Sequence, residues 1–227
     1  MNGKAIIKFL VVIAAIIGLF AYFIQPLAGS LKQGLDLQGG THIVLEAEDS
    51  ATGTADNDAV ERAKQILERR INEMGLSEPL VQREGARRII IELPGVKDPD
   101  EAIKRIGKTA VLEFKNDQGQ TVMTGDDLKD AKEELGQNKQ PLVAIELSDE
   151  GAKKFADLTS KNIGRRIAIT LDGKELTNPV VQQAITGGKA TISGSQSLEE
   201  AKDLAILLRS GALPVKINVL EVRTVGP

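Results

Sequence analysis

An uninterrupted apolar run near the amino terminus constrains the fold of this chain more than any other feature. Residues 9–24 are sixteen consecutive apolar or small residues, and counting from Ile6, with Lys8 inside, extends the run to nineteen. At about 1.5 Å per residue, a helix of that length spans roughly 28 Å, close to the ~30 Å hydrocarbon core of a bilayer. The run therefore predicts a single transmembrane anchor, which we place at residues 1–28.

Basic charge before the run sets the expected orientation of the chain. Lys4, Lys8 and the free amino terminus are positive, and no acidic residue precedes Asp36, so the positive-inside rule keeps the amino terminus in the cytoplasm. A cleaved signal peptide is the alternative, but its apolar region usually has only about 7–15 residues. Pro26 would also occupy the −3 position of the best cleavage site, near Ala28, and fits it poorly. We therefore expect a cell-membrane protein with an extracytoplasmic body.

Composition excludes several function classes. The chain has no cysteine and one histidine, His42, so it offers no disulfide, no cysteine-based redox or metal site and no usual zinc site. A Ser-His-Asp or Cys-His enzyme would depend on His42 alone. Of six aromatic residues only Phe114 and Phe155 follow residue 24, and the net charge is −3, so we expect no nucleic-acid partner. We expect no catalytic residue, metal or cofactor.

The body after the anchor opens with a recognisable order of strands and helices. Alternating apolar residues predict strands, and apolar residues at spacings of three and four predict helices. Asp58, three residues before Glu61, resembles a capping box for the first helix, and Asp98-Pro99 opens the second. The order is β-α-β-β-α-β, which is ferredoxin-like: strand 41–47, helix 57–75, strands 80–84 and 88–93, helix 98–107 and strand 110–115.

The following residues are more polar at first and predict a second set of elements. Asp172-Gly173 is a strong hairpin signal, and Ser197 three residues before Glu200 is a capping box. The predicted elements are helix 125–135, strand 141–147, helix 148–162, strands 166–171 and 189–193, helix 198–210 and strand 215–224.

The motif GLDLQGG lies between the anchor and the first strand. It lacks the Lys-Ser/Thr that ends a phosphate-binding P-loop, and a strand follows it instead of a helix, which disfavours a nucleotide site. Its leucines alternate with polar residues, which favours an edge strand or packing on the base of the domain. Its final glycine pair would allow a turn or a close approach of two backbones. The residues of the motif are Gly34, Leu35, Asp36, Leu37, Gln38, Gly39 and Gly40.

Other candidate groups have a plain structural interpretation. We expect His42, at the start of a strand, to be a surface or interface histidine, because no partner for it is identifiable nearby. Asp36, Glu46 and Glu48 could supply a carboxylate pair, but such proximity is unremarkable among 32 acidic residues. Three arginine pairs are expected to be solvated ends of strands or helices: Arg69-Arg70, Arg87-Arg88 and Arg165-Arg166.

GLDLQGG after a single anchor helix resembles the signature that opens the first extracytoplasmic domain of the SecD family, subunits of the bacterial Sec protein translocase. Four later stretches match the family in the same order, so the resemblance extends over essentially the whole chain. They are DLTSKNIGRRIAITLDGKELTNPVV (157–181), ITGGKATISG (185–194), LEEAKDLAILLRSGALPVKI (198–217) and EVRTVGP (221–227), which ends in Gly226 and Pro227.

The resemblance implies an α+β fold in which a ferredoxin-like base carries a smaller inserted α+β head, after one transmembrane helix. The base would comprise residues 34–115 and 186–225, and the head residues 116–185. The resemblance also implies contact with translocating polypeptide outside the membrane, with movement of the head against the base coupled to the proton-motive force. The implied partners are SecF, the SecYEG channel, unfolded secretory polypeptide and membrane lipid, with SecA and YajC as further candidates.

The sequence departs from the family pattern in its length. Family members have six membrane helices and carry their proton-relay carboxylate in a later one, whereas this sequence ends where a second membrane helix would begin. We therefore expect a fragment or truncated form in which the proton-relay residue is missing. One alternative is a membrane-anchored extracytoplasmic ligand-binding or scaffold domain. A hydrolase is the other, and the composition disfavours it.

Overall fold

The computed structural model describes residues 10–14, 16–20, 39–50, 53–76, 79–96 and 98–226. Residues 10–14 and 16–20 are helical, and their large apolar side chains are exposed. Among the residues described, no helix is both long enough and apolar enough to cross a membrane. Most of the predicted anchor at 1–28, and residues 34–38 of the predicted motif, lie outside the described residues.

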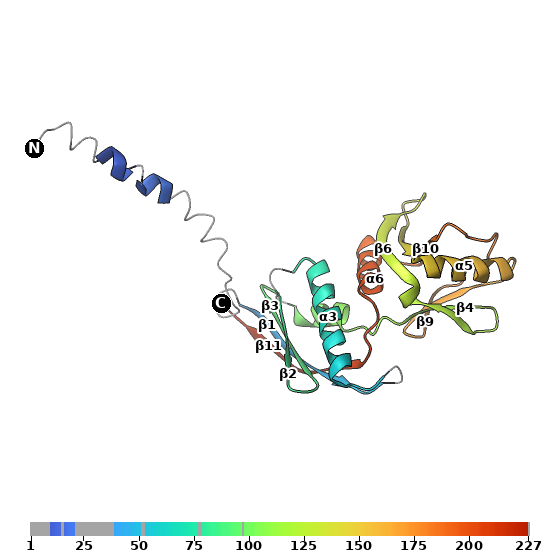
Figure 1. The fold of residues 1–227 in the computed structure, drawn as a ribbon, viewed down its shortest axis with the longest axis horizontal. Helices are drawn as coiled ribbons and strands as arrows, with labels where there is room; N and C mark the ends of the chain where they lie inside the picture. Colours follow the sequence, from blue (N-terminus) through green and yellow to red (C-terminus); the bar gives the residue numbers. More distant parts are fainter. Residues whose placement is uncertain are drawn as a thin grey trace, which may run out of the picture.

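Buried apolar side chains gather in two cores, which divide the described body into two lobes (Figure 1). The first lobe has an antiparallel sheet in the order β11-β1-β3-β2, and two helices contribute to the same core. Its elements are β1 (Gly40–Glu48), α3 (Asn57–Glu73), β2 (Leu80–Glu84), β3 (Arg88–Pro94), α4 (Pro99–Ile106) and β11 (Lys216–Val225). The outer strand β11 thus comes from the far end of the chain.

Local capping chemistry sets where the helices of the first lobe begin. The Asp56 carboxylate accepts a hydrogen bond of 2.8 Å from the Ala59 N–H and begins α3. The predicted capping box of Asp58 and Glu61 was therefore wrong, because the cap lies two residues earlier. Asp98 caps α4 as predicted, and a proline occupies the first turn of that helix.

The strand predicted at 110–115 does not join the first sheet. Residues 112–115 form β4, which pairs with β5 and β8 in the second lobe. β11 takes the place beside β1, in a register that runs from Gly40–Val225 to Glu48–Lys216. The prediction that this strand completes the β-α-β-β-α-β unit was therefore wrong. A strand with one apolar face fits either core, so contacts far apart in the sequence decide which sheet it joins.

The second lobe contains two antiparallel sheets, in the orders β10-β7-β6 and β5-β4-β8-β9. Phe114 and Phe155, the two aromatic residues after residue 24, meet in its core edge to face, with ring centroids 5.9 Å apart. Its elements are β4 (Leu112–Lys115), β5 (Thr121–Thr124), the 3-10 turn η1 (Gly125–Asp127), β6 (Leu128–Leu135), β7 (Pro141–Leu147), α5 (Asp149–Lys161), β8 (Ala168–Leu171), β9 (Lys174–Thr177), β10 (Lys189–Ser193) and α6 (Leu198–Ser210).

The stretch predicted as helix 125–135 is mostly the strand β6. Its residues are good helix formers, but pairing along β7 buries Ala131 in the second core, and this overrides the local preference. The helix prediction was therefore wrong beyond the short turn η1. β10 and α6, placed with the base in the predicted boundaries, pack instead in the second lobe, where β10 pairs with β7 and α6 lies against β6 and β7.

Candidate functional site

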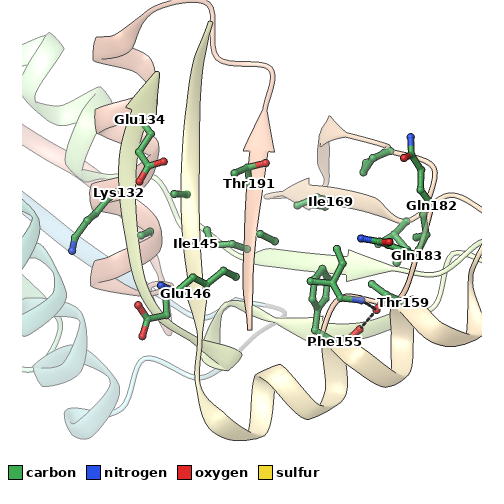
Figure 2. Close-up of a pocket in the computed structure, with 18 of the residues that line it drawn as sticks. Lys132, Glu134, Ile145, Glu146, Phe155, Thr159, Ile169, Gln182, Gln183 and Thr191 are labelled. Carbon is green, nitrogen blue, oxygen red and sulfur yellow. Dashed lines mark hydrogen bonds between the residues drawn. The ribbon is translucent and has the colours of Figure 1, made fainter. Parts of the chain in front are cut away.

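A cleft of about 740 Å³ opens in the second lobe (Figure 2). β6, β7 and β10 line one side of it, and β8, α5 and residues 179–185 contribute to the other. Its volume lies within the roughly 300–1,000 Å³ that is usual for ligand pockets.

Two rows of directly paired residues cross the sheet where it lines the cleft. One row is Lys132, Ala144 and Thr191, and the other, two residues along the strands, has Glu146 at its centre. Lys132 in the first row forms an ion pair with Asp130 at 3.0 Å. A hydrogen bond of 2.6 Å from Lys129 lowers the pKa of Glu146. The floor of the cleft therefore combines small side chains with paired charges rather than a strong field of one sign.

The opposite wall is held in place by hydrogen bonds to its backbone. The Thr159 hydroxyl on α5 accepts a hydrogen bond of 3.0 Å from the Ile185 N–H and donates one of 2.7 Å to the Phe155 carbonyl. The Val181 N–H donates to the Arg165 carbonyl at 2.9 Å. These bonds fix both ends of the segment that carries the exposed residues on this wall.

The rim of the cleft carries exposed apolar and amide side chains. Val180 is 46% exposed on the rim and offers apolar contact. Gln182 and Gln183 are exposed beside it, and their amides can both donate to and accept from a peptide backbone. Within the described ranges no group of three or more His, Asp or Glu side chains is placed to hold a metal ion.

Gly39 and Gly40, the described end of the predicted motif, make a close backbone junction at the start of β1. Gly40 has a φ of +150°, and a Cβ there would lie 2.9 Å from the Pro94 Cα and closer still to the Leu93 carbonyl oxygen. The Gly95 N–H donates a hydrogen bond of 3.1 Å to the Gly39 carbonyl. The predicted close approach of two backbones is therefore confirmed at Gly40.

The two ends of the predicted motif set lie side by side. Gly40 pairs with Val225 in the β1–β11 ladder, so Gly226 follows directly beside the glycine pair. Figure 1 shows β1 and β11 side by side. Gly34–Gln38 and Pro227 lie outside the described residues. The start of β1 and the end of β11 therefore lie together at one end of these two strands, so the described body begins and ends there.

His42 has an acidic partner that the local sequence did not reveal. It lies between Arg223 on β11 and Glu92 on β3, and its Nδ1 is 3.6 Å from Glu92 Oε1. The two side chains are 30% and 32% exposed. His42 is thus a partly exposed strand residue, and its partner could be found only from the pairing of β1 with β3.

Arg70 is the buried charge that sequence reasoning missed, since it was predicted to be solvated and is 0% exposed. Its guanidinium donates to the carbonyl oxygens of Ile106 at 2.6 Å and Gly211 at 2.8 Å, and also to that of Lys108. Burial lowers the pKa of Arg70 to about 10, which a nearby carboxylate partly offsets, so the side chain stays charged at neutral pH.

One pattern in the sequence does indicate that Arg70 is buried. It follows Leu67 by three positions and precedes Met74 by four, which places it on the apolar face of the helix. The prediction that it is a solvated helix end was wrong, because its buried guanidinium bonds to backbone carbonyls and to the Ser210 hydroxyl.

Other predicted groups lie at the surface. Arg87 is 3.3 Å from Asp49, and Arg165 is 2.9 Å from Asp117, in ion pairs with exposed arginine side chains. The expectation of solvated arginines is confirmed for these residues. Asp36 lies outside the described residues, so its predicted pairing with a β1 glutamate stays a prediction.

Comparisons with known proteins cover most of the chain. Three family models match. The SecDF P1 head subdomain matches residues 103–215, and the N-terminal part of the P1 domain of protein translocase subunit SecDF matches residues 60–119. The SecD/SecF GG motif matches residues 31–51. A solved structure, described as a membrane component SecDF that enhances protein export, is 40% identical with a TM-score of 0.73, and the match covers 80% of this chain and 99% of that one. The chain belongs to the SecD/SecDF family of protein translocase subunits.

Further SecD and SecDF relatives agree with this assignment. Protein translocase subunit SecD of Acidaminococcus fermentans is 57% identical over all of this chain and 54% of its own length. SecD of Dictyoglomus turgidum is 46% identical over 86% of this chain and 49% of its own length. A crystal structure of SecDF in a super-membrane-facing form is 42% identical with a TM-score of 0.76, and the match covers 86% of this chain and 31% of that one. The chain thus spans about half the length of the curated SecD relatives it matches.

The SecD family models can be placed on the two lobes. The GG-motif match includes Gly39, Gly40 and the start of β1. The head-subdomain match at 103–215 contains every element of the second lobe, including the cleft.

Proposed function

We propose that this chain forms an anchored, extracytoplasmic part of a SecD subunit that engages unfolded polypeptide during export driven by the proton-motive force. The observation that carries the proposal is the cleft of the second lobe, with its small-residue floor and its exposed Val180, Gln182 and Gln183. Apolar contact and amide hydrogen bonds recognise a polypeptide without demanding a sequence. The chain would act by binding and not by catalysis.

The proposal includes a membrane anchor at residues 1–28, with the amino terminus in the cytoplasm. The apolar run supports this anchor, and a SecDF relative described as a membrane component is consistent with it. Since the described body begins and ends where β1 starts and β11 ends, that end of the first sheet would face the anchor. The GG motif would then orient the body on the membrane.

We also propose that the first lobe is the base and the second lobe the head. The head-subdomain match supports this division, in which β4, β10 and α6 would belong to the head and not to the base. SecF, the SecYEG channel, SecA, YajC and membrane lipid are the proposed partners. The proton relay would reside in a part of the SecD family outside these residues.

Site-specific photocrosslinking tests contact with polypeptide. A photoreactive amino acid at Gln183, inside the cleft, should crosslink to a stalled secretory chain in membranes that carry this protein. Asn138 and Lys174 are further test positions in the proposed head. The same amino acid at Lys202, which is exposed on α6, is the matched control and should give little product. Equal crosslinking at Gln183 and Lys202, or none at any head position, would sink the proposal.

A second substitution tests the GG motif. Asp36→Ala is expected to slow export without unfolding the body, because the motif would set the body on its anchor. Export at the normal rate by this variant would count against that role.

The cleft volume also favours a second candidate, an anchored domain that binds a small ligand or acts as a scaffold. Such a domain should show a thermal shift with a metabolite and no shift with unfolded protein. The export proposal predicts the reverse pattern. Thermal-shift measurements with both kinds of ligand therefore separate the two candidates.

A further inference from the structure

β10 has an unpaired edge where it lines the cleft. It is the outer strand of the order β10-β7-β6, so among the described residues no strand of this sheet lies on its other side. Lys189, Ala190 and Thr191 of β10 line the cleft. Figure 2 shows Thr191 facing the wall that carries Gln182 and Gln183. The free edge of β10 therefore borders the space inside the cleft.

The backbone groups on that edge can be assigned from the hydrogen bonds on the other side of β10. The Leu147 N–H donates a hydrogen bond of 2.8 Å to the Gly188 carbonyl, and this pair continues the register of β7 with β10. In an antiparallel ladder, residues alternate between bonding to the partner strand and facing away from it. Every second residue after Gly188 therefore bonds to β7, and the N–H and C=O groups of Lys189 and Thr191 point to the free edge.

The free stretch is short because β9 lies against its far end. A Cβ at Gly194 would lie 2.9 Å from the Leu176 carbonyl oxygen on β9, and the hydroxyl oxygens of Ser193 and Thr177 are 3.5 Å apart. Neither Ser193 nor Gly194 lines the cleft. The open edge is therefore limited to residues 189–191, about 10 Å of strand.

The opposite wall of the cleft bonds to other partners and not to β10. The Val181 N–H donates to the Arg165 carbonyl at 2.9 Å, and the Val181 carbonyl accepts from the Gly164 N–H at 2.8 Å. The Pro179 carbonyl accepts from the Ile167 N–H at 3.1 Å. These bonds hold the wall away from the free edge of β10, so the space between them stays open for a ligand.

The charges around the cleft do not select a charged ligand. The charged residues that line it are of both signs: Asp130, Lys132, Glu134, Glu146 and Lys189. Lys132 is 3.0 Å from Asp130 in an ion pair. Since neighbouring charges of opposite sign cancel, the field inside the cleft is weak. The groups that the cleft offers in a fixed geometry are the main-chain donors and acceptors of β10.

We propose that unfolded polypeptide binds by adding a strand to the free edge of β10, through main-chain hydrogen bonds to Lys189 and Thr191. This inference rests on the proposed function, since it states how the cleft holds its polypeptide. Main-chain bonds give affinity for any extended segment that lacks proline at the bonded positions. An edge exposed on a convex surface would also pair with folded sheets, whereas the walls of the cleft admit a single extended chain.

Binding is measured with the purified full 227-residue chain in detergent. The probe is fluorescein-labelled, reduced and carboxymethylated lactalbumin, a permanently unfolded protein, followed by fluorescence anisotropy. Thr191→Pro removes one outward N–H, and its ring blocks an approaching strand. An edge strand tolerates proline where the N–H faces outwards. Ser193→Pro is the matched control, because Ser193 has the same place in the ladder but lies outside the cleft.

We expect Thr191→Pro to weaken binding of the probe about tenfold, and Ser193→Pro to change it by less than about twofold. Circular dichroism checks that both variants are folded. Equal affinities in wild type and Thr191→Pro would overturn the strand pairing, and so would equal losses in the two proline variants.

Hydrogen exchange tests the same contact in the wild-type chain, without any substitution. Saturating probe should slow exchange of the Lys189 and Thr191 amides about tenfold or more, because these donors gain a partner. The Ala190 and Ile192 amides bond to β7 already and should exchange at an unchanged rate. Mass spectrometry with fragmentation to single residues measures all four amides. No slowing at Lys189 and Thr191, or equal slowing at all four positions, would contradict the proposal.

A cleft-filling substitution, Ala144→Trp, separates this outcome from failure of the proposed function. If the wild-type chain does not bind the probe, or Ala144→Trp binds it normally, the proposed function fails and the strand pairing is overturned with it. If the wild-type chain binds, Ala144→Trp abolishes binding and Thr191→Pro binds like wild type, the cleft is the binding site and only the strand pairing fails.

Discussion

The Arg70 guanidinium on α3 donates a hydrogen bond of 2.8 Å to the carbonyl oxygen of Gly211, where the chain returns from the second lobe to the first. The same side chain donates at 2.6 Å to the carbonyl of Ile106, where the chain leaves the first lobe. One buried arginine thus holds both connections between the lobes. Its backbone partners are the ends of α4 and α6, whose last carbonyls would otherwise lack donors.

Arg70→Met is expected to destabilise the protein strongly. It would leave the buried carbonyls of Ile106 and Gly211 without their donor, at a cost of roughly 1–3 kcal/mol for each unsatisfied group. We expect the free energy of unfolding, measured in urea by circular dichroism, to fall by about 3 kcal/mol or more. Arg69→Met, at the exposed neighbour, should change it by less than about 0.5 kcal/mol. Similar small changes in both variants would contradict the role given to Arg70.

Gly40→Ala should cost more stability than the same change at Gly95. Both glycines have positive φ, so alanine is strained at either position. At Gly95 the added Cβ meets open space, and we expect a loss of about 1 kcal/mol. At Gly40 it meets the backbone of Leu93 and Pro94, and we expect about 3 kcal/mol. Thermal unfolding compares the two, and equal losses would show that the close approach is not what requires glycine.

Glu113 is expected to make part of the stability depend on pH. Hydrogen bonds from Lys115 and then Thr121 lower the pKa of this carboxylate from its ordinary value of 4.5. A lowered pKa in the folded state gives stability that is present above pH 4.5 and is lost as the pH falls through the folded pKa. Glu113→Gln should therefore be slightly less stable than wild type at neutral pH, by less than about 1 kcal/mol because the side chain is partly exposed.

Urea unfolding at neutral and acid pH measures the Glu113 effect. The difference between wild type and Glu113→Gln should shrink as the pH falls below 4.5. Glu68→Gln, at an exposed helix position, should differ little from wild type at either pH. A difference between wild type and Glu113→Gln that grows in acid would refute the assignment.

Val180→Asp should weaken polypeptide binding while leaving the fold intact. Val180 is 46% exposed on the cleft rim, so a charge there removes apolar contact without entering the core. We expect the affinity for reduced, carboxymethylated lactalbumin to fall about fivefold and the free energy of unfolding to change by less than about 0.5 kcal/mol. Val122→Asp, at a valine that is 41% exposed and lies outside the cleft, should leave the affinity unchanged. Equal losses in both variants would mean that the cleft is not the contact surface.

Signals confined to a few neighbouring residues predicted local structure well. The Asp172-Gly173 turn forms with both residues at positive φ, as the hairpin signal requires. Ser197 accepts a hydrogen bond of 3.1 Å from the Glu200 N–H and begins α6. Gly85, at positive φ, lies in the turn between β2 and β3, which joins the two strands predicted at 80–84 and 88–93. In each case the donor, the acceptor or the allowed φ belongs to the segment itself.

Apart from the capping box at Asp58, which lies two residues from the true cap, the predictions that failed needed a partner far along the chain. Residues 128–135 have helical propensity but form β6, because pairing with β7 stabilises the strand by more than the local preference stabilises a helix. The candidate cleft also could not be predicted from the sequence. Its walls come from β6, β7, β10 and residues 179–185, which pairing and packing alone bring together.

The sequence by itself determined the family, the apolar amino-terminal run, the turns and most helix caps, because these depend on residues adjacent in the chain. Tertiary structure alone decided that β11 rather than β4 lies beside β1. It alone buried Arg70 against Gly211, 141 positions away, and placed Arg209 between Glu73 and Ala131. The physical reason is that the burial of a side chain and the hydrogen bonding of backbone groups depend on the whole packed chain. A residue's partners therefore appear only when distant segments meet.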